Sequence, residues 1–274
     1  MTTHGGCLCG AVEYEITGPC TNMLNCHCGL CRKSHGSLFA TFTSVPKDSL
    51  VFTCGEEHIR NYSVSSHLAR SWCDICGTTL PFLEGINYSV PAGTLKDDIP
   101  ATIVGHIFTA SKLPWYDITD DLRQYDTFPN SMSRPAVTTP PDVPASSGSC
   151  LCRTCRFDLM GEPLMMMNCH CNRCRRSRSA AHATNVFYPA EALQWISGEQ
   201  SVQQFKLPVA DRFGSAFCIE CGSLMPRIHG DRCNIPVGCL NIDPGIRPKG
   251  HIFTDNKANW FEITDDMPQF PTAS

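Results

Sequence analysis

Apolar residues in this 274-residue chain fall in short runs that are separated by glycine and proline. Runs of this kind, rich in β-branched and aromatic residues, are typical of strands, and the glycines and prolines between them favour turns. Long apolar stripes with the 3.6-residue period of an amphipathic helix are missing. The pattern therefore predicts a mainly β protein. In the first half of the chain, the expected strands cover residues 12–16, 38–42, 50–52, 88–90 and 106–108.

An internal repeat organises the whole chain. Residues 25–32 read NCHCGLCR, and residues 168–175 read NCHCNRCR. Other short motifs recur with an offset of 143 residues before the middle of each unit and 145 after it, so the two copies differ in length by only two residues there. Self-similarity on this scale indicates one fold, duplicated in tandem.

The segment between the two copies is rich in proline, serine and threonine, a composition that favours extended, solvated backbone. We therefore expect a first domain over residues 1–127, a linker over 128–147 and a second domain over 148–274.

Composition and charge restrict the expected partners and cellular location of the protein. Hydrophobic residues make up 42% of the chain, enough for two cores, and the net charge of -4 gives no long-range attraction to nucleic acid or anionic membranes. No apolar run of about 18 residues and no signal-peptide pattern is present, so we expect a cytoplasmic protein without nucleic-acid or membrane partners. Since that compartment is reducing, the 19 cysteines are expected to bind metal or act in catalysis.

Four cysteines of each copy have the spacing of a closed zinc site. In an extended segment Cys7 and Cys9 point the same way, and the CxxC pair Cys73 and Cys76 can complete a tetrahedron. We expect structural zinc at this site and at its counterpart. The second copy offers Cys150, Cys152, Cys218 and Cys221.

The central motif supplies only three thiols, Cys26, Cys28 and Cys31. Three protein ligands and one exchangeable position make the arrangement of a catalytic metal site. The equivalent thiols of the second copy are Cys169, Cys171 and Cys174.

A closed structural site is the alternative for these triads, with the fourth ligand taken from a leftover cysteine. None of the leftover cysteines has a cysteine at the aligned position of the other copy, which favours the open site, and we expect them to be small buried residues. They are Cys20, Cys54, Cys155, Cys233 and Cys239.

Histidines and arginines near the triads suggest supporting roles. By strand alternation, His27 and His170 lie opposite the flanking thiols and are expected to pack or support, not to bind metal. Arg32 and Arg175 directly follow the triads, and each could bind a substrate carboxylate or simply pack over the zinc loop.

Three further sets of polar residues recur or cluster. His106 and His251 occupy matching GHIFT segments and are expected to be hydrogen-bonded core histidines, with acid-base catalysis as the alternative. The pairs at 120–121 and 265–266, all aspartates, follow threonine and are typical of turns. A local cluster of arginines in the second copy is interpreted as a solvated face, with anion binding as the alternative. Its members are Arg173, Arg175, Arg176 and Arg178.

With CxCGxV at 7–12, NCHCxxCR at 25–32 and CxxCGT at 73–78, the first unit resembles the glutathione-dependent formaldehyde-activating enzyme (GFA) and centromere protein V family. The second unit resembles it as well. The resemblance implies two tandem β-tent domains, a structural zinc on the CxC and CxxC cysteines and a catalytic zinc on the CHCxxC cysteines, hence four zinc ions per chain. It also implies a carbon-sulfur lyase of the S-(hydroxymethyl)glutathione synthase type.

The second copy departs from that family pattern. Arg153 occupies the position aligned with Gly10, and Ser179 occupies the position aligned with Gly36. These changes alter loops without removing a ligand. The sequence therefore favours a zinc enzyme in which a thiol, such as glutathione or a conjugate of it, occupies the open position and adds to, or leaves from, a carbonyl electrophile such as formaldehyde. A zinc scaffold for a protein or chromatin partner is the alternative. A pocket between the units is a third possibility, one that would accept a larger conjugate.

Overall fold

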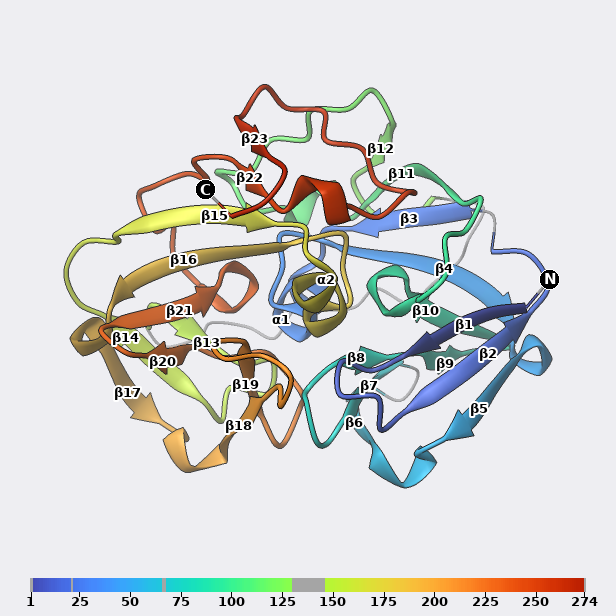
Figure 1. Cartoon of the computed structure of the whole chain (residues 1–274), viewed down its shortest axis with the longest axis horizontal. Helices are drawn as coiled ribbons and strands as arrows, with labels where there is room; N and C mark the ends of the chain where they lie inside the picture. Colours follow the sequence, from blue (N-terminus) through green and yellow to red (C-terminus); the bar gives the residue numbers. More distant parts are fainter. Residues whose placement is uncertain (1, 21, 66–67, 130–145, 274) are drawn as a thin grey trace.

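Each half of the chain folds into β-sheets arranged around two cysteine clusters, as the computed structural model shows for residues 2–20, 22–65, 68–129 and 146–273. Figure 1 shows the halves side by side, with the two α-helices at the centre. The mainly β prediction is confirmed. Most of the linker predicted over 128–147 lies outside the described residues.

In the first half, a six-stranded sheet has the order β12-β11-β3-β4-β10-β9, and two three-stranded sheets have the orders β1-β2-β5 and β6-β7-β8. The strands are β1 (Thr2–Gly6), β2 (Glu13–Thr17), β3 (Asn22–Cys26), β4 (Ala40–Pro46), β5 (Leu50–Cys54), β6 (Ile59–Ser65), β7 (Leu68–Cys73), β8 (Thr79–Leu80), β9 (Phe82–Glu84), β10 (Asn87–Pro91), β11 (Thr102–Ile107) and β12 (Arg123–Tyr125).

The second half repeats this plan, with sheets of the order β20-β21-β16-β15-β22-β23, β13-β14-β17 and β18-β19. The strands are β13 (Gly148–Ser149), β14 (Arg156–Leu159), β15 (Met165–Cys169), β16 (Ala183–Pro189), β17 (Leu193–Ser197), β18 (Val202–Lys206), β19 (Gly214–Cys218), β20 (Arg227–His229), β21 (Arg232–Pro236), β22 (His251–Ile252) and β23 (Gln269–Phe270).

Two α-helices of seven residues each, α1 (Gly29–His35) and α2 (Asn172–Arg178), begin inside the triad motifs. The Cys28 side chain caps α1 by accepting from the backbone N–H of Cys31, and Cys171 does the same for α2. The 3-10 helices are η1 (Lys47–Ser49), η2 (Glu56–His58), η3 (Ala92–Thr94), η4 (Thr109–Ser111), η5 (Ala190–Ala192), η6 (Glu199–Ser201), η7 (Val237–Cys239) and η8 (Thr254–Asn256).

The C-terminal caps of the helices explain one departure of the second copy. Gly36 ends α1 with a φ of 60°, a left-handed conformation that glycine adopts without strain, and Ser179 ends α2 with a φ of 52°. The Ser179 hydroxyl donates to the backbone carbonyl of Thr79 in the other unit at 2.7 Å. That hydrogen bond helps to offset the strain of a non-glycine residue at this position.

The two units share one hydrophobic core and pack through reciprocal contacts. Helix α1 contacts η7, and α2 contacts η3. A Cβ on Gly77 would lie 2.5 Å from the Phe217 ring, and a Cβ on Gly222 would lie 2.5 Å from the Trp72 ring. Because each contact recurs with the units exchanged, an approximate two-fold axis relates the copies, as in a dimer with identical contact patches.

Some residues lie on this axis and face their own counterparts. The Nδ1 of His35 is 2.8 Å from the backbone carbonyl oxygen of Arg178, its aligned residue. Thr119 Oγ1 lies 2.6 Å from Oγ1 of its counterpart Thr264. The duplicated units therefore meet at equivalent surfaces.

Candidate functional site

The CxC and CxxC motifs converge on one point in each unit. Cys7 and Cys9 lie in the turn between β1 and β2, and Cys73 ends β7. The four Sγ atoms of the first cluster all lie within 4.8 Å of one another. The Cys7–Cys9 and Cys9–Cys73 Sγ separations are 3.4 and 3.8 Å. A tetrahedral zinc with bonds of about 2.3 Å to sulfur has sulfur-sulfur edges of roughly 3.8 Å, so the cluster fits that ion.

The second cluster repeats this geometry. The Cys150–Cys152 and Cys152–Cys218 Sγ separations are 3.4 and 3.8 Å. In each unit a backbone N–H donates to the first thiol of the CxC motif at 3.3 Å, from Val12 in one copy and Cys155 in the other. These donors favour the thiolate form that a metal requires. Each half thus holds one cluster of four thiols that could bind a metal ion.

The triads lie where a strand of the large sheet meets an α-helix. Cys26 ends β3, Cys28 caps α1 and Cys31 lies in its first turn. The three Sγ atoms lie within 4.8 Å of one another, as do those of the second triad. Among the described residues, no fourth cysteine, histidine or carboxylate joins either triad. The sequence analysis correctly grouped these three thiols. The described residues supply no fourth ligand to either triad.

Four of the leftover cysteines are buried, as predicted. Cys54 is exposed, so the prediction that it packs as a buried residue is wrong. Cys54 pairs with Glu13 at the end of β5, where the strand leaves the core.

A buried guanidinium lies beside the first triad, and the sequence did not reveal it. Arg70 on β7 is 3% exposed, and its Nη2 donates to Cys31 Sγ at 3.4 Å. Its guanidinium also lies over the Phe82 ring, 4.4 Å from the centroid. Hydrogen bonds with the Cys26 and Cys31 thiols, together with the Arg70 charge, hold the pKa of Cys28 well below its usual range.

The second triad has a buried guanidinium from a different element. Arg178, at the end of α2, is buried, and its Nη2 donates to Asn185 Oδ1 at 2.7 Å. Burial lowers the pKa of Arg178, and the nearby Cys174 thiol partly opposes this shift. The residue aligned with Arg70 is Ser215, and the residue aligned with Arg178 is His35. Each unit therefore has one buried arginine near its triad, but the arginine comes from β7 in the first unit and from α2 in the second.

The predicted substrate-binding arginines already have protein partners. Arg32 Nε donates to the His27 carbonyl at 3.3 Å, and its Nη2 donates to the Ser111 carbonyl at 3.2 Å. Arg175 Nη2 donates to Asn172 Oδ1 at 2.6 Å. A role of either arginine toward a substrate stays a prediction.

The arginine cluster of the second copy is not a solvated face. Only Arg173 is exposed, whereas Arg175 and Arg176 are half-buried and Arg178 is buried. Arg176 donates to the backbone carbonyl of Cys7 in the other unit. The interpretation fails because α2 lies between the two units.

The histidine of each triad motif directly follows its strand, and among the described residues it does not join the thiols, as predicted. His27 is fully buried, its ring lies 5.4 Å from that of Phe39, and burial lowers its pKa to about 3. His27 Nε2 lies 2.8 Å from His106 Nδ1, and His106 Nε2 lies 3.0 Å from an Asp120 carboxylate oxygen. The parallel pairing of β3 and β11 places His106 beside this strand.

The second unit has the same chain of side chains. His170 Nε2 lies 2.8 Å from His251 Nδ1, and His251 Nε2 lies 3.1 Å from the Asp265 carboxylate. The prediction of hydrogen-bonded core histidines is confirmed. Asp120 accepts from the Leu122 N–H, which fits the predicted turn, but its bond to a buried histidine was missed. The recurring separation of 14 residues between histidine and aspartate was the available signal.

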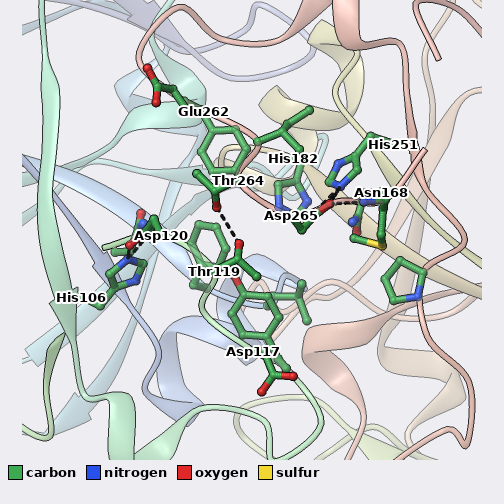
Figure 2. Close-up of a pocket in the computed structure, with 18 of the residues that line it drawn as sticks. His106, Asp117, Thr119, Asp120, Asn168, His182, His251, Glu262, Thr264 and Asp265 are labelled. Atoms are coloured by element: carbon green, nitrogen blue, oxygen red, sulfur yellow. Dashed lines mark hydrogen bonds and ion pairs between the residues drawn. The ribbon is translucent and has the colours of Figure 1, made fainter. Parts of the chain in front are cut away.

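A cavity of about 170 Å³, here called the axial pocket, lies between the units at their two-fold axis. Figure 2 shows both histidine-aspartate pairs around it, with the hydrogen bond between Thr119 and Thr264 crossing from one unit to the other. None of the triad cysteines lines the cavity. An inter-unit pocket therefore exists as the sequence allowed, but this volume is well below the roughly 300–1,000 Å³ of pockets for drug-sized ligands, so it is too small for a glutathione conjugate. The lining residues are Asn25, Leu38, Phe39, His106, Trp115, Tyr116, Asp117, Thr119, Asp120, Asn168, His182, Pro248, His251, Phe261, Glu262, Ile263, Thr264, Asp265 and Met267.

No helix in the described parts of the chain is both long enough and apolar enough to cross a membrane.

Comparison with known proteins matches both halves of the chain to one family. A family model described as glutathione-dependent formaldehyde-activating enzyme matches residues 2–111 and 145–256. An uncharacterized lyase of Schizosaccharomyces pombe is 35% identical over 79 residues, which are 29% of this chain and 56% of that protein. The chain thus spans about half the length of that relative.

Two further matches cover most of the other protein. A Halomonas elongata protein, provisionally named glutathione-dependent formaldehyde-activating enzyme, is 28% identical over 137 residues, which are 43% of this chain and 82% of that protein. A crystal structure of a Rhodobacter sphaeroides protein matches with a TM-score of 0.30 and 22% identity, covering 36% of this chain and 99% of the other.

Proposed function

The chain belongs to the glutathione-dependent formaldehyde-activating enzyme family, and we propose that it forms or cleaves a carbon-sulfur bond at its cysteine triads. The observation that carries this proposal is the open geometry of the triads, because three thiols lie within 4.8 Å and no fourth donor among the described residues joins them. A closed structural site would have four protein ligands.

The donor set suits a thiol substrate. The three thiols of a triad would hold a zinc ion, and the ion would then have one further position for a soft ligand such as a thiolate. The chain itself contributes charge and shape. Arg70 brings a positive charge to Cys31, which offsets part of the negative charge of three thiolates. An apolar cluster that includes Ile107 and Phe108 packs against Cys26 and limits access of water.

The proposed reaction joins a thiol to an aldehyde. The thiol sulfur forms a bond to the carbonyl carbon, the carbon-oxygen π bond breaks, and the proton released by the thiol ends on the oxygen. The product is a hemithioacetal, which carries an S-hydroxymethyl group when the aldehyde is formaldehyde. Cleavage is the reverse of this reaction. Glutathione and formaldehyde are proposed as the reactants on the strength of the family description and of the name of one relative, the Halomonas elongata protein.

We expect the first triad to be the more active. Its helix ends at Gly36, as in the family pattern, and Arg70 donates directly to one of its thiols. The second triad is followed by a helix that ends at Ser179, and its nearby Arg178 is hydrogen-bonded to Asn185. The two centres therefore differ in their buried arginine, which donates to a triad thiol in the first unit and to an asparagine in the second.

The reaction can be followed by two-dimensional carbon-13 exchange spectroscopy, using labelled formaldehyde, glutathione and the zinc-loaded chain. This method measures the rate of adduct exchange at equilibrium, so the spontaneous reaction can be subtracted. We expect the chain to accelerate exchange, Cys28→Ser to remove most of the acceleration and Cys171→Ser to remove less. Cys54→Ser is the matched control, because Cys54 is an exposed cysteine outside all four clusters.

Two results would contradict the proposal. One is exchange at the spontaneous rate with glutathione and with smaller thiols, in a protein shown to hold zinc. The other is full acceleration by the double variant Cys28→Ser, Cys171→Ser. Either result would favour the alternative of a zinc scaffold, which predicts zinc binding and a partner but no exchange.

A further inference from the structure

We propose that the axial pocket binds a small organic ammonium ion, at a site separate from the cysteine triads. The pocket lies between the units, and its walls come from both of them. Its charged groups are carboxylates, its rim is acidic and its inner walls include aromatic rings. Each of these properties points to a cation that carries N–H donors and an apolar body.

The carboxylates give the pocket its charge. Asp120 and Asp265 line the cavity, one from each unit, and Asp117 and Glu262 line its exposed rim. Among the described residues no lysine or arginine lines the pocket, and Arg247 lies outside the lining, with its guanidinium 5.2 Å from the centroid of the Trp115 ring. Asp120 and Asp265 each accept from one histidine and one backbone N–H, and a carboxylate has about four lone-pair positions, so both retain capacity for a ligand.

Two lysines lie close to the pocket, one from each unit, but their ammonium groups already have hydrogen-bond partners. Lys112 Nζ donates to the backbone carbonyl of Tyr116, and Lys257 Nζ donates to that of Phe261, both at 2.6 Å. Their ammonium groups therefore bond to the backbone of two lining residues, although neither lysine lines the cavity itself.

His182 provides an unpartnered acceptor inside the cavity. Its side chain lies in the pocket wall, and the residue is 6% exposed. The Thr184 hydroxyl donates its hydrogen to Asn168 Oδ1 at 2.7 Å, so it can only accept from His182 Nδ1, which is 3.3 Å away. The proton of the neutral ring is therefore on Nδ1. Nε2 then carries a lone pair, and no donor reaches it from the described residues.

This acceptor is specific to one unit. Phe39 occupies the aligned position and faces His182 across the axis, with ring centroids 5.7 Å apart. Phe261 lies 5.5 Å from the His182 ring and 6.3 Å from the Phe39 ring. The pocket thus combines one polar wall and one aromatic wall, and aromatic faces attract cations.

The volume limits the occupant to a small molecule. A cavity of about 150 Å³ is large enough for benzene, and the axial pocket measures about 170 Å³. A benzylammonium ion is a suitable probe, because it joins one aromatic ring to one ammonium group. Benzyl alcohol and benzoate have similar shapes with neutral and negative head groups.

Isothermal titration calorimetry with the zinc-loaded full chain tests the proposal. We expect benzylammonium to bind, benzyl alcohol to bind at least tenfold more weakly and benzoate not to bind at millimolar concentration. His182→Phe removes the Nε2 acceptor and reproduces the ring of the aligned position, and Asp265→Asn removes one charge at nearly constant shape. Each variant is expected to weaken binding about tenfold, the effect of one lost charge-assisted hydrogen bond.

Controls separate this site from the triads. Glu199→Gln, which removes an exposed carboxylate outside the pocket, should leave binding unchanged. The double variant Cys28→Ser, Cys171→Ser should still bind benzylammonium, so a failed lyase test and a failed amine test are distinguishable. The proposal is overturned if benzylammonium does not bind at millimolar concentration, if benzoate binds equally well, or if His182→Phe and Asp265→Asn both bind with unchanged affinity. A crystal soaked with benzylammonium locates the bound molecule.

Discussion

Arg70 is expected to strengthen metal binding at the first triad only. The Arg70 Nη2 lies 3.4 Å from Cys31 Sγ, and the residue is 3% exposed. At an effective dielectric constant of about 20, two unit charges at that separation attract each other by roughly 5 kcal/mol. Desolvation of the guanidinium removes part of this, and hydrogen bonds to charged groups contribute about 1.5–3 kcal/mol net. Arg70→Gln should therefore weaken zinc binding at this triad by about tenfold to a hundredfold.

The measurement is a zinc competition titration against a chromophoric chelator. The second triad is first disabled by Cys171→Ser, so that the first is the only triad with three thiols. Arg70→Lys should lose less affinity than Arg70→Gln, because it keeps the charge but not the planar fork. Arg178→Gln is the matched control, since it lies by the second triad and should leave the first unchanged.

Two outcomes would refute the reasoning. If Arg70→Gln leaves the affinity of the first triad unchanged, the guanidinium contributes no charge to the bound state. If it lowers the affinity of the second triad equally, measured in a chain whose first triad is disabled by Cys28→Ser, its effect is a general loss of structure. A thermal melt of each variant in saturating zinc distinguishes that second case.

Three further predictions concern stability. Gly93→Ala should lower the free energy of unfolding by more than 2 kcal/mol, roughly the cost of overpacking, because its Cβ would lie 2.2 Å from the Ala180 nitrogen; urea titration checks this. Gly85→Ala, whose Cβ would meet nothing within 4 Å, should cost only the roughly 1–2 kcal/mol strain of an alanine at a left-handed φ of 64°. Burial lowers the pKa of His35 from 6.5 to about 4, so its unfolded state binds more protons and stability falls from pH 7 to pH 5, by about 2 kcal/mol from this group. His35→Phe should lose that much less in urea titrations over this range, and an identical loss would contradict the assignment. Removal of zinc from a Cys73→Ser variant by a chelator should cause a smaller fall in melting temperature than in the unaltered chain, because one closed cluster is already broken.

The fold class and the cysteine clusters could be predicted because local patterns encode them. The CxC and CxxC spacings and the repeat showed which thiols belong together. The expected extended segment at Cys7 and Cys9 is wrong, because the two thiols converge through the turn between β1 and β2. The α-helices were not predicted, since seven residues are too few to display a 3.6-residue period, and their start depends on the cap at Cys28.

The arginines and the carboxylate of the site depend on tertiary structure. Arg70 is 39 residues from Cys31 in the sequence and donates to it from β7. Arg178 lies near the second triad and belongs to α2, the helix that begins in that triad. A comparison of the two copies conceals this, because Ser215 and His35 stand at the aligned positions. The sequence predicts Asp120 to be a turn residue. Its hydrogen bond to His106 depends on the tertiary structure that includes the pairing of β11 with β3.

The residues on the two-fold axis indicate what joining the copies in one chain makes possible. In a dimer of identical subunits, a residue on the axis must be compatible with itself, as Thr119 and Thr264 still are. Within one chain each position can mutate alone, and His182 now faces Phe39. Separately expressed halves should therefore prefer each other to copies of themselves, so covalent linkage has turned a self-complementary surface into a surface with two distinct sides.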